Sequence, residues 1–123
     1  MATSRTVLVV DDDRQAVALI AGLLRAAGYQ PLAAYDAVQG MLLANRAVPG
    51  LIVLDLQLPA GGGIQMLERL GGSLRTQSIP VLVCSASTQK AIDEYVRRKG
   101  AAGFLPKPFE PAQLLAAVAA ALG

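Results

Sequence analysis

The sequence contains no histidine, no tryptophan and a single cysteine among its 123 residues. One cysteine cannot form a disulfide within the chain. Because Cys84 lies inside an aliphatic run, we expect its thiol to be buried and the protein to occupy a reducing compartment. Aromatic residues make up only 4% of the chain, and the basic residues are scattered. These features argue against direct binding to nucleic acid.

Long apolar runs are also missing. The longest apolar stretches, residues 17–24 and 114–122, are too short and too rich in alanine and glycine to span a bilayer. The sequence does not start with a basic segment followed by an apolar one, so it does not indicate secretion. We therefore expect a cytoplasmic protein that does not insert into a membrane.

The composition is that of a folded domain. Apolar residues make up 54% of the chain and charged residues only 16%, which excludes a disordered protein. A length of 123 residues is near the commonest size of a single domain. We therefore expect one domain that covers residues 1–123.

Short aliphatic segments alternate along the chain with segments whose apolar residues recur at helical spacing. The expected strands are residues 6–10, 29–35, 51–54, 79–84 and 102–105. The expected helices are residues 14–27, 36–46, 64–70, 88–99 and 110–122, with Asp13 as the N-cap of the first and a loop at 59–63 before the third. This alternation predicts an α/β fold, with an open parallel sheet covered by helices on both faces.

The first and last helices have unusually apolar outer faces. We expect the first helix to bury a stripe made of Ala16, Leu19, Ile20, Leu23, Leu24 and Ala27, which leaves Val17, Ala18, Ala21 and Gly22 outside. The last helix carries alanine at 112, 116, 117 and 119–121. A helix that faces water normally carries charge at such positions, so both faces predict coverage by another surface. The alternative is that these small residues simply tolerate solvent.

Polar side chains stand where the expected strands end. Asp11 and Asp12 follow the first strand, Asp55 follows the third, Ser85 follows the fourth and Lys107 comes shortly after the fifth. The carboxyl ends of parallel strands meet at one edge of a sheet, which is where such folds bind ligands. The sequence therefore predicts that these five residues form one cluster.

This cluster has the components for chemistry at phosphorus. Three converging carboxylates repel one another unless they bind a cation, and oxygen ligands without histidine or cysteine favour Mg²⁺ first and Mn²⁺ next. Lys107 supplies an ammonium and Ser85 a hydroxyl donor for a phosphoryl group. Asp55 in this setting is a candidate nucleophile, and its product would be an aspartyl phosphate.

Four motifs resemble one known family. They are VLVVDDD at residues 7–13, LDLQLP at 54–59, VLVCSA at 81–86 and GFLPKPF at 103–109. In this order and spacing they resemble the receiver domain of two-component response regulators, across essentially the whole chain. The resemblance implies a flavodoxin-like (βα)5 fold, a doubly wound sheet with strand order 2-1-3-4-5. It also implies a receiver domain without an output domain in this chain.

The resemblance assigns roles to individual residues. It implies that Asp55 accepts the phosphoryl group and that Asp11 and Asp12 bind the metal, with the backbone carbonyl of Gln57 completing the site. Lys107 matches the family's invariant lysine, and the peptide bond that follows it is expected to be cis. Ser85 matches the switch hydroxyl and Phe104 the aromatic switch, although Phe104 could equally be an aromatic residue of the core.

The resemblance also implies partners. A histidine kinase or a histidine phosphotransfer protein would supply the phosphoryl group, and the domain would catalyse its own phosphorylation and dephosphorylation rather than act as a turnover enzyme. Phosphorylation would change the face built from the fourth helix, fifth strand and fifth helix. We expect the first helix to dock a helical phosphodonor, and the last helix to pack against a second copy or a neighbouring domain.

Two other functions remain to be weighed. A phosphatase of the haloacid dehalogenase type would use Asp11 and Asp13, but it needs a hydroxyl side chain where Gln15 stands and a longer chain. A receiver fold that is never phosphorylated and acts as a constitutive interaction module is the second alternative. The complete set of acidic, hydroxyl and lysine residues argues against it. No glycine-rich nucleotide-binding motif follows the first strand.

Overall fold

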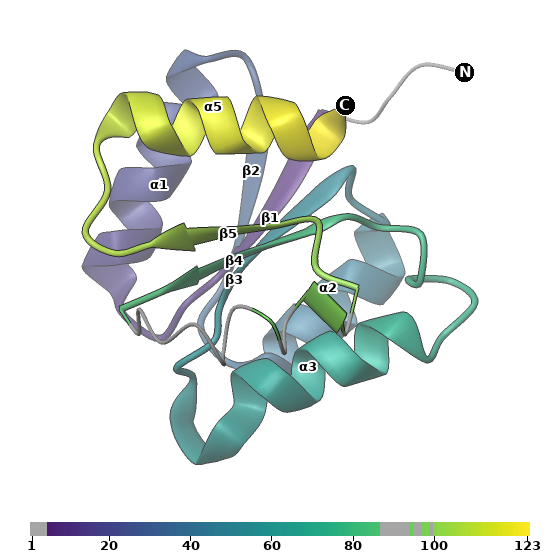
Figure 1. The fold of residues 1–123 in the computed structure, drawn as a ribbon. Coiled ribbons are helices and arrows are strands. Elements are labelled where there is room, and N and C mark those ends of the chain that lie inside the picture. The colour runs from purple at the N-terminus through teal and green to yellow at the C-terminus, as the bar shows by residue number, and fades with distance from the viewer. Residues whose placement is uncertain (1–4, 87–93, 95–96, 99) are drawn as a thin grey trace.

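Five parallel strands form the centre of the molecule in the order β2-β1-β3-β4-β5 (Figure 1). The computed structural model describes residues 5–86, 94, 97–98 and 100–123. The strands are β1 Thr6–Val10, β2 Gln30–Ala34, β3 Leu51–Asp55, β4 Val81–Ser85 and β5 Gly103–Pro106. The predicted α/β fold and its strand order are confirmed.

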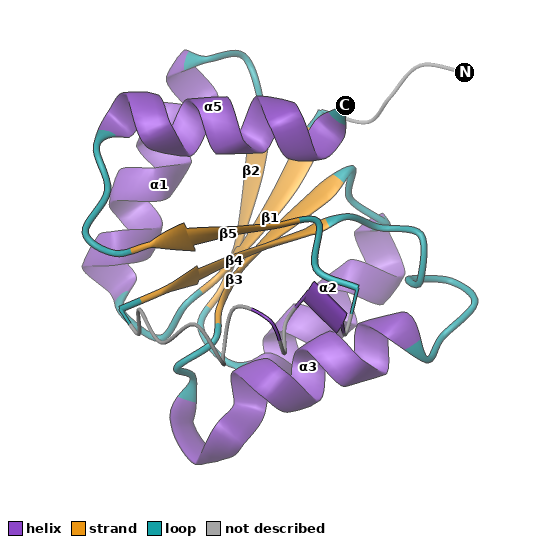
Figure 2. Cartoon of the chain, viewed as in Figure 1, coloured by secondary structure: helices purple, strands orange, loops and turns teal. Residues whose placement is uncertain are grey.

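Helices cover both faces of the sheet, which gives three layers (Figure 2). The helices are α1 Arg14–Ala26, α2 Ala37–Ala47, α3 Gly62–Gly71 and α5 Pro111–Leu122, and a 3-10 turn, η1, spans Pro59–Gly61. Helices α1 and α5 pack on one face, and α2 and α3 pack on the other. The fourth helix predicted at 88–99 lies outside the described residues, except that Glu94, Arg97 and Arg98 are helical.

The central strands are buried on both sides because their residues are aliphatic at successive positions. In β1, Leu8 and Val10 point into the core beneath α2 and α3, while Val7 and Val9 point into the core beneath α1 and α5. All five residues of β3 are buried, including Asp55. This strand therefore brings an ionisable group to the edge of the core.

The predicted core stripe of α1 is confirmed at Ile20 and Leu24, which are buried, and wrong at Leu19. Val17, expected outside, is buried, and Leu19, expected inside, is 60% exposed. The helix packs through Val17, Ile20 and Leu24, which recur at intervals of three and four residues. Almost every position of this helix is apolar, so the spacing allows two neighbouring stripes and does not choose between them.

The predicted loop at 59–63 is shorter than expected. Helix α3 begins at Gly62, directly after η1, and both Gly62 and Gly63 are buried. A side chain at Gly63 would collide with the backbone carbonyl of Leu56 and lie 2.7 Å from that of Asp55. The absence of a side chain therefore allows α3 to start against the end of β3.

Side chains cap the N-terminal ends of α1 and α5. The Asp13 carboxylate accepts hydrogen bonds from the backbone N–H groups of Gln15 and Ala16, so the predicted N-cap is confirmed. At the start of α5, Glu110 and Gln113 form a reciprocal capping box.

The exposed residues of α5, all of them described, carry no charge. The expected role of this helix in self-association stays a prediction, which sedimentation equilibrium would test. No helix among the described residues is long and apolar enough to cross a membrane.

The single thiol should be inert while the chain is folded. Cys84 is buried in β4, and burial raises the pKa of its thiol to about 12, with Lys107 opposing the rise and Asp55 adding to it. Relative to the ordinary value of 9.0, this leaves roughly a thousandfold less thiolate near neutral pH. We expect iodoacetamide at pH 8 to leave Cys84 unmodified in the native chain and to alkylate it fully in guanidinium. Alkylation at equal rates in both conditions would contradict the burial of β4.

Candidate functional site

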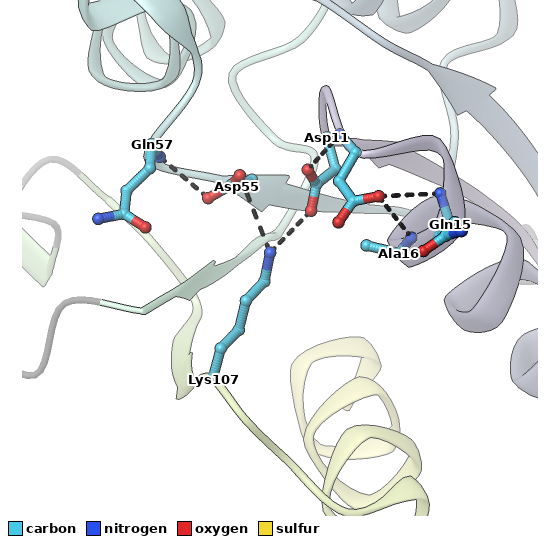
Figure 3. Close-up of polar contacts among 7 residues, drawn as sticks. Asp11, Gln15, Ala16, Asp55, Gln57 and Lys107 are labelled. Carbon is cyan, nitrogen blue, oxygen red and sulfur yellow. Dashed lines mark hydrogen bonds and ion pairs between the residues drawn. The ribbon is translucent and has the colours of Figure 1, made fainter.

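Three carboxylates converge at the carboxyl edge of the sheet, where the ends of β1 and β3 meet, and Figure 3 labels two of them, Asp11 and Asp55. Asp11 and Asp12 follow β1, and Asp55 is the last residue of β3. One carboxylate oxygen from each of the three lies within 4.8 Å of the others. Asp11 and Asp55 are buried and Asp12 is exposed, so the cluster opens to solvent on one side.

Backbone N–H groups hold the two buried carboxylates in place. The N–H of Asp13 donates to Asp11 Oδ1 at 2.9 Å, and the N–H of Gln57 donates to Asp55 Oδ1, also at 2.9 Å. Each of these donors lies two residues after its acceptor, where the chain turns out of a strand. The turn at each strand end therefore fixes the direction of its carboxylate.

Lys107 forms ion pairs with both buried carboxylates, Asp11 and Asp55. Its Nζ lies 2.7 Å from Asp11 Oδ2 and 3.8 Å from Asp55 Oδ2 (Figure 3). The backbone N–H of Lys107 donates to the carbonyl of Ser85 at 2.8 Å, which ties the segment after β5 to the end of β4. The predicted cis bond between Lys107 and Pro108 is confirmed.

The electrostatics of the site favour a bound cation. Burial raises the pKa of Asp55, and the charge of Asp11 adds to this, against the hydrogen bond from Gln57 and the charge of Lys107. Burial lowers the pKa of Lys107, but its hydrogen bond to Asp11 and the charges of Asp55 and Asp11 outweigh this and raise it overall. Lys107 is therefore charged, and the carboxylates still lack full compensation.

The donor set fits a hard divalent ion. Three carboxylates and one ammonium leave a formal charge of −2, which one divalent cation would neutralise. All three side chains offer oxygen, and oxygen ligands at close quarters are those that Mg²⁺ and Mn²⁺ prefer. Asp11, Asp12 and Asp55 are thus the residues that would hold such an ion, with Gln57 adjacent to Asp55.

The remaining predicted residues lie close to this cluster or behind it. Ser85 is fully buried at the end of β4, beside the segment that carries Lys107. The side chain of Gln57 is exposed, while its backbone faces Asp55. Phe104 is half-buried in β5 and packs against the core beneath α2 and α3.

Two features of the site could not be found from residue types. The N–H of Asp13 orients Asp11, but any residue other than proline supplies an N–H at that position, so its side chain gives no signal. The second feature is a groove of about 360 Å³ between α1 and the segment after β5, which we call the donor groove. It is lined by Asp13, Ala16, Leu19, Ile20, Ala86, Lys107, Pro108 and Phe109.

The fold and the site together define a class of protein. The sequence profile of the response regulator receiver domain matches residues 7–119, and the chain belongs to this family. Among curated relatives, it is 38% identical over 118 residues to the DNA-binding dual master transcriptional regulator RpaA of Synechocystis sp., covering 94% of this chain and 48% of RpaA. It is 33% identical over 121 residues to the phosphate regulon transcriptional regulatory protein PhoB of Escherichia coli, covering 97% and 52%.

The chain spans about half the length of these two relatives. Among solved structures, the chemotaxis protein CheY4 of Vibrio cholerae matches with a TM-score of 0.90 and 26% sequence identity, covering 98% of this chain and 99% of that chain. The resemblance drawn from the four motifs is confirmed at the level of the receiver domain.

Proposed function

We propose that this receiver domain accepts a phosphoryl group on Asp55 from a phosphohistidine of a partner protein. The observation that carries the proposal is the buried Asp55 carboxylate, held by the Gln57 N–H, with Lys107 Nζ 3.8 Å away and two further carboxylates beside it. A fixed carboxylate is a nucleophile, and a nearby ammonium can stabilise the charge that develops on a transferring phosphoryl group.

The reaction needs no other side chain as a base. An Asp55 oxygen forms a bond to phosphorus while the phosphorus–nitrogen bond breaks, and the imidazole of the donor keeps the electron pair and binds a proton. A divalent cation held by Asp11, Asp12 and Asp55 would neutralise charge on the phosphoryl oxygens. Lys107, already within reach of both buried carboxylates, pairs with one of those oxygens.

The product is a transient signal rather than the result of a turnover enzyme. We expect the hydroxyl of Ser85, the last residue of β4, to bond the new phosphoryl group, and Phe104, which lies in the adjacent strand β5 and pairs with Val83, to move with it. Movement of these two residues would alter the surface made by the predicted fourth helix, β5 and α5. The labile acyl phosphate then hydrolyses and restores the starting state.

The partner that fits is a histidine kinase or a histidine phosphotransfer protein. Leu19 on α1 is 60% exposed and lines the donor groove, close to Lys107 and the carboxylate cluster. A large apolar side chain exposed beside a reactive group suits an interface that forms during transfer. Helix α1 is therefore our candidate docking element, although Val17, one of the four outer positions on which this expectation was based, is buried.

The proposal predicts metal-dependent phosphorylation by a small donor. We would incubate the chain with Mg²⁺ and phosphoramidate and follow its intact mass, with a second sample in EDTA. One phosphoryl adduct should appear with Mg²⁺, should be removed by hydroxylamine, and should form at least about a hundredfold more slowly in EDTA, because the carboxylates then repel the phosphoryl group. A folded chain that forms no adduct with Mg²⁺ would instead support the constitutive interaction module.

A further inference from the structure

A second cavity lies at the amino edge of the sheet, at the opposite ends of the strands from the carboxylate cluster. Its volume of about 440 Å³ is within the range of pockets that bind small molecules. It lies between the C-terminal end of α3, residues 76–79 that lead into β4, and Arg98 and Gly100 before β5. We call it the amino-edge pocket. It shares no lining residue with the donor groove.

The amino-edge pocket has an apolar floor and a polar mouth. Leu67 and Val81 line it and are only 2% and 3% exposed, so they form its floor. Gln77, Ser78 and Arg98 also line it, and all three are exposed, so they form its mouth. Among the described lining residues, Arg98 is the one that carries a charge. A ligand would therefore meet hydrocarbon inside the pocket and a single cation at its entrance.

Hydrogen bonds hold the wall between α3 and β4 in place. The hydroxyl of Thr76 donates to the carbonyl of Leu70 at 2.8 Å, which ties this segment to the last turn of α3. The backbone N–H of Gln77 donates to the carbonyl of Ser73 at 2.8 Å. That of Ile79 donates to the carbonyl of Thr76 at 3.0 Å. The wall is thus ordered before any ligand arrives, so binding would cost little conformational entropy there.

We propose that the amino-edge pocket binds small organic carboxylates that have an apolar body. A guanidinium pairs with a carboxylate through two parallel N–H···O bonds, and one cation at the mouth matches a single negative charge. No described residue forms an ion pair with Arg98, so its guanidinium is available to a ligand. The hydrocarbon body would lie against Leu67 and Val81 and leave water.

The test compares 2-naphthoate with its neutral analogue 2-naphthamide, which has nearly the same shape. Amide chemical shifts of the ¹⁵N-labelled chain would be followed as each probe is added, without Mg²⁺ or a phosphodonor, so the outcome does not depend on the proposed function. We expect naphthoate to bind at least about fivefold more tightly, because only the carboxylate forms a charged pair with Arg98. Equal affinities, or no binding of naphthoate up to about 10 mM, would overturn the inference.

The donor groove is the competing site, because it also combines apolar surface with a cation, the ammonium of Lys107. The positions of the shifted amides separate the two sites. The largest shifts should fall on Gly71, Ser78 and Gly100, which line the amino-edge pocket. Shifts centred on Leu19 and Phe109 would assign the probe to the donor groove and overturn the inference.

Two matched variants test the role of the guanidinium. Arg98→Gln removes the charge at the mouth, while Arg25→Gln makes the same change in the last turn of α1, outside the pocket lining. Both arginines are exposed, so neither change removes core packing. We expect Arg98→Gln to bind naphthoate no more tightly than naphthamide, and Arg25→Gln to keep the fivefold preference. A preference that survives Arg98→Gln, or that falls equally in both variants, would overturn the inference.

Discussion

Replacing Asp55 by asparagine should abolish phosphoryl uptake in a chain that remains folded. Asparagine has nearly the same shape and keeps an oxygen that can accept the hydrogen bond from the Gln57 N–H, which is 2.9 Å from Asp55 Oδ1. It has no carboxylate to attack phosphorus, so the rate of adduct formation should fall by at least about a thousandfold. Intact mass with Mg²⁺ and phosphoramidate measures this directly.

The same variant should be more stable than the wild type when metal is removed. Because the pKa of Asp55 is raised in the folded chain, the free energy of unfolding that this group contributes is greatest below its ordinary pKa of 3.8 and is lost as the pH rises through the folded value. At neutral pH in EDTA the wild type therefore bears an unfavourable buried charge that asparagine lacks. Urea unfolding at pH 4 and pH 7 should show the advantage of Asp55→Asn growing with pH.

Asp36→Asn supplies the matched control. Asp36 is an exposed N-cap of α2 whose carboxylate accepts from the Gln39 N–H, and asparagine caps equally well. Its uptake and its response to pH should match the wild type. An adduct that persists in Asp55→Asn, mapped to Asp12 or another carboxylate, would show that we have named the wrong acceptor.

The strands and the cluster were predictable for one physical reason. Three of the strands, β1, β3 and β4, carry an aliphatic run that ends at an acidic or hydroxyl residue, as Val10 is followed by Asp11 and Leu54 by Asp55. A parallel sheet brings the carboxyl ends of its strands to one edge, so residues that are far apart in the sequence lie close together in space. The contact between Lys107 and Asp11, 96 residues apart, follows from this rule.

What could not be predicted depends on packing rather than on residue type. Helix α1 has apolar residues on every side, so only its contact with the sheet and with α5 decides that Val17 is buried and Leu19 exposed. The donor groove exists because of that choice, since the exposed Leu19 is one of its walls. The close approach of Gly63 to β3 likewise appears only once both backbones are placed.

Gly63→Ala adds only one methyl group, yet we expect it to lower the free energy of unfolding strongly. The new Cβ would collide with the carbonyl of Leu56 and lie 2.7 Å from that of Asp55, and backbone cannot move aside as a flexible side chain can. We expect a loss of about 3 kcal/mol or more in the free energy of unfolding, and a melting temperature lower by about 10 °C or more. Urea and thermal unfolding would measure both.

Gly22→Ala is the same chemical change where nothing obstructs it. Gly22 is exposed in α1, and a Cβ there would meet no atom within 4 Å, so alanine should stabilise the chain by about 0.5–1 kcal/mol. The two variants should change the free energy of unfolding in opposite directions, which separates a local collision from a general property of glycine.

Gly63→Ala should also weaken Mg²⁺ binding, measured as the metal-induced rise in melting temperature. The reason is that the displaced backbone carries Asp55 and the N–H of Gln57 that orients it. Equal stability of both variants would mean that α3 does not need to begin against the end of β3.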